Sequence, residues 1–122
     1  MAGLTTAEAQ AALDFLFPTS GASDFIAYST DGTTETGILA RTAIGATGWA
    51  AATAADPSVK ANGSILTTAT ATGAGAITHF RVMTESSGGA ARTDWTALTA
   101  SKTLAIGDSA TWAVGALKVT LT

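Results

Sequence analysis

The fold of this chain is decided by its last third, which reads ITHFRVM at residues 77–83, TESSGGA at 84–90 and RTDWTALTASKTLAIGDSATWAVGALKVTLT at 92–122. Short segments rich in Thr, Val, Ile and aromatic residues alternate there with Gly and Ser turns. At the end of the chain, Lys118 and Thr120 alternate with three aliphatic residues, as in a strand with one buried face. The pattern predicts a series of short antiparallel strands.

Working back toward the N-terminus, the same two-residue period recurs between turn signals. Asp31-Gly32 is a hairpin-turn signal, because Gly tolerates a positive φ. Two turn signals close together, at 55–58 and 61–64, predict a loop. Strands are predicted over residues 25–30, 37–44, 50–53, 64–72, 77–84, 93–98, 102–106, 110–114 and 117–121. We expect an all-β fold, a small antiparallel β-sandwich or barrel-like domain of about seven to nine strands.

One short helix is predicted before the strands, over about residues 6–17. Thr5 and Glu8 have capping-box spacing, Leu4 precedes them as a possible hydrophobic staple, and Pro18 follows the last helical position. The apolar residues at helical spacing are Ala9, Leu13, Leu16 and Phe17. We expect this stripe to cover the sheet, with Leu13 and Leu16 packed inward.

Length and composition indicate one domain, residues 1–122, with a thin core. The hydrophobic share is 47 %, but much of it is Ala, so the bulk must come from a few aliphatic residues and three Trp. The chain has no Cys, so disulfides cannot supplement the packing. A thin core makes self-association a source of further stability. We therefore expect an oligomer, with a homotrimer as the first choice.

Charge and hydropathy argue against several classes of partner. Charged residues make up 12 % of the chain and the net charge is −3, without the basic runs typical of nucleic-acid binding. The first 23 residues do not read as a signal peptide, and no apolar run approaches the roughly 20 residues of a membrane span. We expect a soluble protein, made in the host cytoplasm, that binds neither nucleic acid nor membrane.

The polar residues do not form a pattern typical of catalysis or of cofactor binding. His79, the one histidine, lies in a predicted strand, where a structural hydrogen bond is the expected role. The Asp residues mostly lie beside Gly, Pro or strand ends, where Asp caps turns. Residues 31–35, DGTTE, are the best candidate for calcium but lack further carboxylates. We expect a protein that is not an enzyme and has no metal or cofactor.

The three Trp residues admit two interpretations. An aromatic platform could bind glycans, as a receptor-binding tip would, whereas a small core in an Ala- and Thr-rich chain also needs bulky side chains. Trp95 and Trp112 lie at strand positions, so we expect them in the core. Trp49 lies in a Gly-flanked break between predicted strands, which makes it the best candidate for an exposed Trp.

The order of motifs in the C-terminal half is similar to that of a known family. ITHF at 77–80, the Gly88-Gly89 pair, WTAL at 95–98, SKTLAIGD at 101–108 and WAVGALKVTL at 112–121 follow one another. In this order the chain resembles small virion proteins of tailed bacteriophages, often labelled tail fibre proteins and in some phages found as capsid decoration proteins. The resemblance is weaker over the N-terminal helix, residues 25–30, Arg41 and Trp49.

The resemblance implies an all-β virion component and transfers no catalytic residue. A compact unit that repeats over a shell fits a chain of this length, so we expect a capsid decoration or cement protein on the outer surface of the head, with the major capsid protein as its partner. The alternative is a tail fibre tip or minor tail protein that binds a host surface receptor such as a glycan. The residues expected to make capsid or subunit contacts are Met1, Ala2, Gly3, Leu4 and Trp49.

Overall fold

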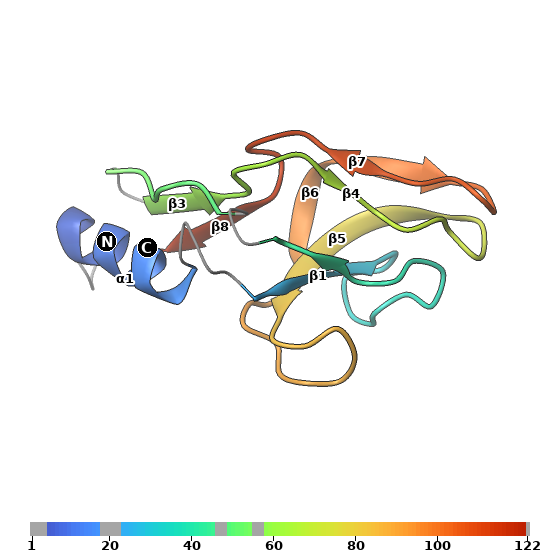
Figure 1. Ribbon diagram of the computed structural model, residues 1–122, viewed down its shortest axis with the longest axis horizontal. Coiled ribbons are helices and arrows are strands. Elements are labelled where there is room, and N and C mark those ends of the chain that lie inside the picture. Colours follow the sequence, from blue (N-terminus) through green and yellow to red (C-terminus); the bar gives the residue numbers. More distant parts are fainter. Residues whose placement is uncertain (1–4, 18–22, 46–48, 55–57, 122) are drawn as a thin grey trace.

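The computed structural model describes residues 5–17, 23–45, 49–54 and 58–121, which form one helix and eight strands (Figure 1). The helix lies at one end of the molecule and the strands form three small sheets, in which every pair is antiparallel. The elements are α1 (Thr6–Leu16), β1 (Phe25–Ser29), β2 (Thr42–Ala43), β3 (Ser58–Ala61), β4 (Leu66–Thr67), β5 (Gly75–Met83), β6 (Thr96–Leu104), β7 (Thr111–Trp112) and β8 (Lys118–Leu121).

The predicted helix is confirmed, and its start has the predicted cap. The side chain of Thr5 accepts a hydrogen bond from the Glu8 backbone N–H at 3.3 Å, which satisfies one of the free donors of the first turn. The helix ends at Leu16, one residue before the predicted end, and Phe17 is its C-cap. The staple predicted at Leu4 lies outside the described residues. Eleven residues make α1 too short to cross a membrane, and the described part of the chain has no helix long enough.

Helix α1 packs on one narrow stripe that differs from the predicted one. Ala9, Leu13 and Phe17, spaced four residues apart, are all buried. Leu16 was predicted to pack inward, but 44 % of it is exposed, because it lies to one side of that stripe. Phe15 is 85 % exposed on the side away from it. The helix therefore covers strand β3 with one face and offers the other to solvent.

An ion pair between a buried lysine and a partly exposed aspartate fixes α1 to β3. The Lys60 side chain in β3 is fully buried, and its Nζ lies 2.6 Å from Oδ1 of Asp14, whose side chain is 40 % exposed. The same oxygen accepts the backbone N–H of Ala52 at 2.9 Å. These bonds from Lys60 and Ala52 hold the pKa of Asp14 below its ordinary value. Asp14 is thus the one carboxylate that satisfies the buried ammonium group in this contact.

The main sheet has the strand order β2-β1-β5-β6 and supplies part of the core. Strands β1 and β5 pair along their whole shared length, from Phe25 opposite Met83 to Ser29 opposite His79. Ile26 and Tyr28 of β1 are fully buried, and so are Ala27 and Ser29 on the opposite face, so both faces of this strand are covered. The buried residues of β5 and β6 are Ile77, Phe80, Val82, Met83 and Leu104.

Two small sheets, β3-β8 and β4-β7, complete the described structure. The prediction of a mostly β fold with short antiparallel strands and an N-terminal helix is confirmed. Among the described residues the three sheets stay separate and do not close into a barrel.

Several predicted strand bounds were wrong, mostly where the chain is rich in Ala, Thr and Gly. Strand 37–44 shortens to β2 and strand 64–72 to β4, because their remaining backbone groups bond to loops, as Thr72 does to the Ile38 carbonyl. The predicted loop at 55–64 contains β3, and the strand predicted over 50–53 is an irregular segment bonded to it. The strands predicted at 93–98 and 102–106 are one strand, β6.

Replacing Asp14 should loosen the helix through Lys60. In the Asp14→Ala variant the buried ammonium group has lost its counter-charge, so we expect the free energy of unfolding to fall by about 1 to 3 kcal/mol. Adding Lys60→Met to that variant should restore part of the loss, because the unpaired charge is then gone. Urea unfolding followed by circular dichroism measures both. Asp94→Ala, at an exposed site, is the control. Equal stability of Asp14→Ala and the control would contradict the assigned role.

The same pair predicts an acid dependence of stability. Because the pKa of folded Asp14 lies below its ordinary value of 3.8, its contribution is fully present above that value. The contribution is lost as the pH falls through the folded pKa. The stability difference between the parent chain and Asp14→Asn should therefore shrink on acidification below pH 3.8. A difference that stays constant from neutral to strongly acidic pH would show that Asp14 does not stabilise through its charge.

Candidate interaction surface

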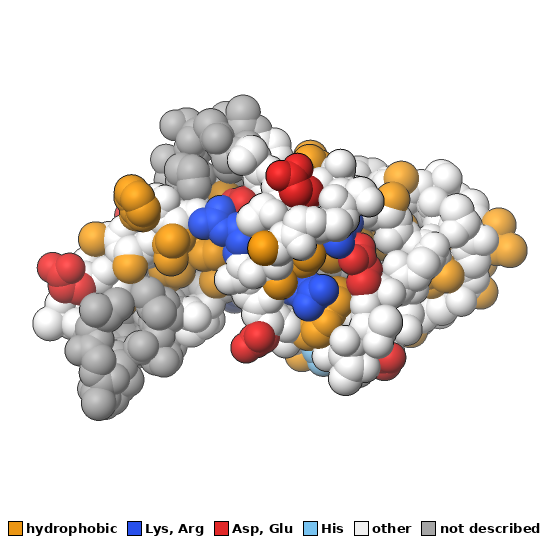
Figure 2. Space-filling model, turned by 90° about the horizontal axis from the view of Figure 1, so that it is seen from below, with side chains coloured by type: hydrophobic (Ala, Val, Ile, Leu, Met, Phe, Trp, Pro, Cys, Tyr) orange, Lys and Arg blue, Asp and Glu red, His pale blue; other side chains and the backbone are white. Residues whose placement is uncertain are grey.

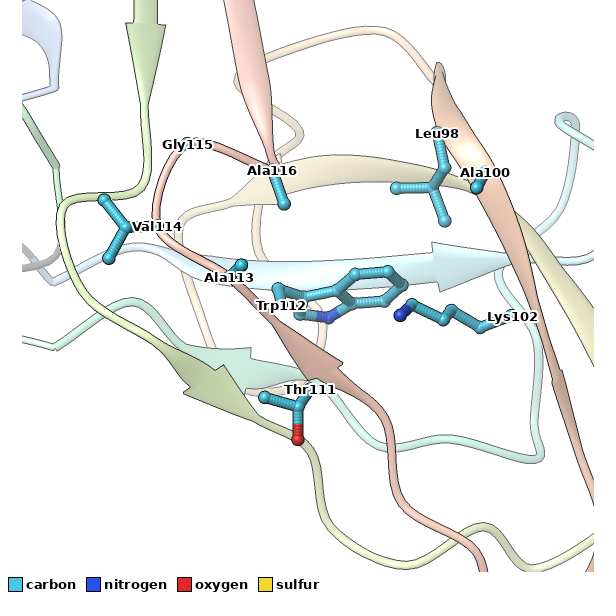
Figure 3. A pocket seen from close by; sticks show the side chains of 9 residues that line it. All are labelled: Leu98, Ala100, Lys102, Thr111, Trp112, Ala113, Val114, Gly115 and Ala116. Carbon is cyan, nitrogen blue, oxygen red and sulfur yellow. The ribbon is translucent and has the colours of Figure 1, made fainter.

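An open groove of about 410 Å³ lies between β6 and β7 (Figure 3). Leu98, Ala100 and Lys102 project from β6 toward Trp112 of β7. They lie on one side of the strand because successive side chains alternate. The full lining is Leu98, Ala100, Lys102, Thr111, Trp112, Ala113, Val114, Gly115 and Ala116. We call this feature the Trp112 groove.

A bulge in β6 separates this part of the strand from the main sheet. Ile77 of β5 pairs with Lys102 and His79 pairs with Ala97, so residues 98–101 of β6 lie opposite residue 78 alone. Extra residues on one strand bend it and leave part of it unpaired with its neighbour. The bulge thus supplies one wall of the Trp112 groove.

Trp112 forms the floor of the groove and is 2 % exposed. Its ring stacks on Tyr28 with centroids 6.0 Å apart, and its Nε1 donates to the Tyr28 hydroxyl at 3.2 Å. That hydroxyl donates in turn to Oγ1 of Thr42 at 2.6 Å. Burial raises the pKa of Tyr28, and the two hydrogen bonds oppose this rise only in part. The floor is therefore a fixed, neutral aromatic pair.

The rim of the groove combines apolar surface with one positive charge. Nζ of Lys102 lies 5.4 Å from the centre of the Trp112 ring, within the range of a cation–π contact. Val114 is 59 % exposed, and Leu98 and Ala116 are half-buried. An apolar side chain beside a negative charge would match this lining, whereas no side chain in it is a strong nucleophile.

Trp49, the predicted exposed Trp, is 1 % exposed, so that prediction was wrong. Its ring meets Phe17 edge-on with centroids 5.2 Å apart, and its Nε1 donates to Oδ2 of Asp24 at 3.2 Å. The other oxygen of Asp24 accepts from Arg92 at 2.6 Å. Trp49 therefore anchors the end of the helix and is no surface platform. The other predicted contact residues, Met1, Ala2, Gly3 and Leu4, lie outside the described residues.

The other two Trp residues divide between core and surface. Trp112 is buried, as predicted. Trp95 was predicted to lie in the core, but it is half-buried, and the guanidinium carbon of Arg81 lies 4.3 Å from its ring centre. Trp95 immediately precedes β6, at the outer edge of the main sheet, where fewer neighbours surround it.

His79 and Asp31 have the predicted structural roles. Nδ1 of His79 lies 2.8 Å from Oγ1 of Thr78, which confirms a strand histidine held by a hydrogen bond. Oδ1 of Asp31 accepts from the backbone N–H groups of Thr33 and Thr34, which confirms the turn cap and holds the pKa of Asp31 well below its usual range. Among the described residues, no group of three or more His, Asp or Glu could hold a metal ion.

Arg41 is matched to a carboxylate and to a turn. Nε and Nη2 of Arg41 donate to the two oxygens of Glu35 at 2.9 and 2.8 Å, while its Nη1 donates to the carbonyls of Glu85 and Gly88. Arg41 thereby lowers the pKa of Glu35 and fixes the 85–88 turn. Figure 2 shows basic and acidic side chains interspersed on one face.

Sequence reasoning missed the Trp112 groove and the exposed Phe15. The groove depends on the bulge, whose register cannot be read from β6 alone. The exposure of Phe15 could have been predicted in part from the sequence, because Phe15 lies outside the stripe made by Ala9, Leu13 and Phe17.

Comparison with known proteins identifies a family. The family described as Podophage GP4 fiber I protein gp80 matches residues 4–120, which include all the elements described above except the last residue of β8. No curated protein matches the chain.

Shortening Trp112 should cost far more stability than shortening the rim. Trp112→Ala removes a buried ring and the donor to Tyr28, so we expect the free energy of unfolding to fall by about 3 to 5 kcal/mol. Val114→Ala, at the exposed rim, should change it by less than about 0.5 kcal/mol. Chemical denaturation of both variants tests this difference. Similar losses in the two would mean that Trp112 is not the floor of the groove.

Proposed function

We propose that this chain, which belongs to the Podophage GP4 fiber I protein gp80 family, is a structural subunit of a phage tail fibre and works by contact with other protein subunits. The observation that carries the proposal is the match of that fibre family to residues 4–120, nearly the whole chain. A folded unit with a mostly β architecture and an apolar groove suits such a role, because assembly needs complementary surfaces.

The family match supports the tail fibre alternative of the sequence analysis better than the capsid decoration protein that stood first. The capsid interpretation was preferred because a single chain of this length is short compared with a whole tail fibre. A fibre can be assembled from short subunits, however, when head-to-tail contacts repeat along it. The major capsid protein as a partner depended on the capsid interpretation and has no support from the match.

Within the tail fibre interpretation, a structural subunit fits the described surface better than a glycan-binding tip. A glycan platform needs exposed aromatic faces, but Trp49 and Trp112 are buried and Arg81 lies over Trp95. The lining of the Trp112 groove is mainly aliphatic, which suits a protein side chain better than a sugar.

The position of the protein in the virion tests the proposal. Antibodies raised against the purified chain and coupled to gold should label the tail fibres of intact particles in electron micrographs. Antibody adsorbed with the purified chain beforehand is the control and should give no label. Mass spectrometry of separated heads and tails provides a second measurement, with the chain expected in the tail fraction. Labelling spread over the heads would overturn the proposal.

A further inference from the structure

Two apolar features of this chain lack a partner in the described structure, and they are complementary. The first is the outer face of α1, where Glu8, Ala11 and Phe15 are exposed at helical spacing. Phe15 is 85 % exposed, the highest value among the large hydrophobic side chains of the described residues. We call these three residues the helix knob. The second feature is the Trp112 groove.

The charges of the two features are opposite. Helix α1 contains Glu8 and Asp14 and no Lys or Arg, and Asp14 is already paired with Lys60. Glu8 forms no ion pair with the described residues and supplies the charge of the helix knob. Lys102 supplies the charge of the Trp112 groove, beside an otherwise apolar lining. Opposite charges at the edge of an apolar contact favour one partner and one orientation.

The shapes also match. A groove of about 410 Å³ with walls from Leu98 and Val114 can take an aromatic side chain, and removing an exposed Phe from water there favours association.

The helix knob and the Trp112 groove lie on different parts of the molecule. Helix α1 is at one end, whereas the groove lies between β6 and β7, toward the middle (Figure 1). Phe15 and Glu8 are not among the residues that line the groove. One copy of the chain therefore presents both surfaces separately, and the partner that fits both is a second copy.

We propose that the helix knob of one copy binds in the Trp112 groove of the next, with Phe15 against the apolar walls at Leu98 and Val114 and Glu8 near Lys102. The contact is heterologous, because each copy uses two different surfaces and keeps one of each free. Such contacts form a closed ring when the rotation between copies closes, as in a trimer, and otherwise a line of subunits. The proposal concerns contact between copies and does not depend on where in the virion the protein lies.

Complementation between two broken variants tests this contact. Phe15→Asp removes the knob, and Val114→Asp places a charge at the groove rim; both sites are exposed, so circular dichroism should stay native. In sedimentation velocity, each variant alone should self-associate about tenfold more weakly than the parent chain, or more weakly still. Mixed together they should form a one-to-one dimer, since each supplies the surface that the other lacks. Ile106→Asp, at a 74 % exposed site outside both surfaces, should associate like the parent chain.

A cross-linking experiment provides a second measurement that needs no aspartate in the apolar contact. Because the chain has no Cys, a disulfide can form only between introduced thiols. A mixture of Phe15→Cys and Val114→Cys should give a mixed disulfide dimer under mild oxidation, while Phe15→Cys with Ile106→Cys should give much less. Exchanging the two charges provides a third measurement. Glu8→Lys and Lys102→Glu should each weaken self-association, and a chain that carries both substitutions should recover it.

Three results would overturn the proposal. One is a parent chain that stays monomeric at all concentrations, and another is self-association that neither Phe15→Asp nor Val114→Asp weakens. The third is a mixture of the two variants that forms no dimer and no preferred disulfide. Antibody labelling of tail fibres is a separate measurement, so failure here leaves the proposed place in the virion to its own test.

Discussion

The contact between Tyr28 and Trp112 joins the main sheet to one of the two small sheets. Strand β1 belongs to the main sheet and β7 to a two-stranded sheet, and no hydrogen-bonded ladder connects these two sheets in the described residues. The ring stack and the hydrogen bond from Trp112 to the Tyr28 hydroxyl join them through side chains instead. A two-stranded sheet is marginal by itself, so its stability must come from this packing. The floor of the Trp112 groove is therefore also a joint of the fold.

Elements with strong local signals could be predicted from the sequence. The helix followed from its cap and its apolar spacing, and β5 and β8 followed from alternation. Strand β3 was taken for a loop, because Asn62-Gly63 after it and Pro57 before it outweighed a four-residue strand. Its identity depends on pairing with β8, some sixty residues later in the chain, and on the buried Lys60, which needs Asp14 from the helix.

Side-chain exposure was harder to predict than secondary structure. Trp49 lies in a Gly-flanked segment that suggests a surface loop, yet its ring is enclosed by Phe17 and by Asp24, both distant in sequence. Leu16 shows the opposite error, because it was predicted to be buried and is partly exposed. Neighbouring helix positions point in different directions, so a shift of one residue decides whether a side chain such as Phe15 faces β3 or solvent. The candidate surface could not be found from the sequence, since it requires the register of β5 against β6.

The β6 bulge also bears on how this chain could diversify. Pairing on both sides of it is fixed, by Gly75 to Ile77 at one end and by His79 and Phe80 at the other. A residue gained or lost among residues 98–101 would change one wall of the groove without shifting either register, so no buried side chain of β5 would turn to the opposite face. The bulge is thus a place where natural variants can alter the partner they select while the folding of the rest of the sheet is left as it is.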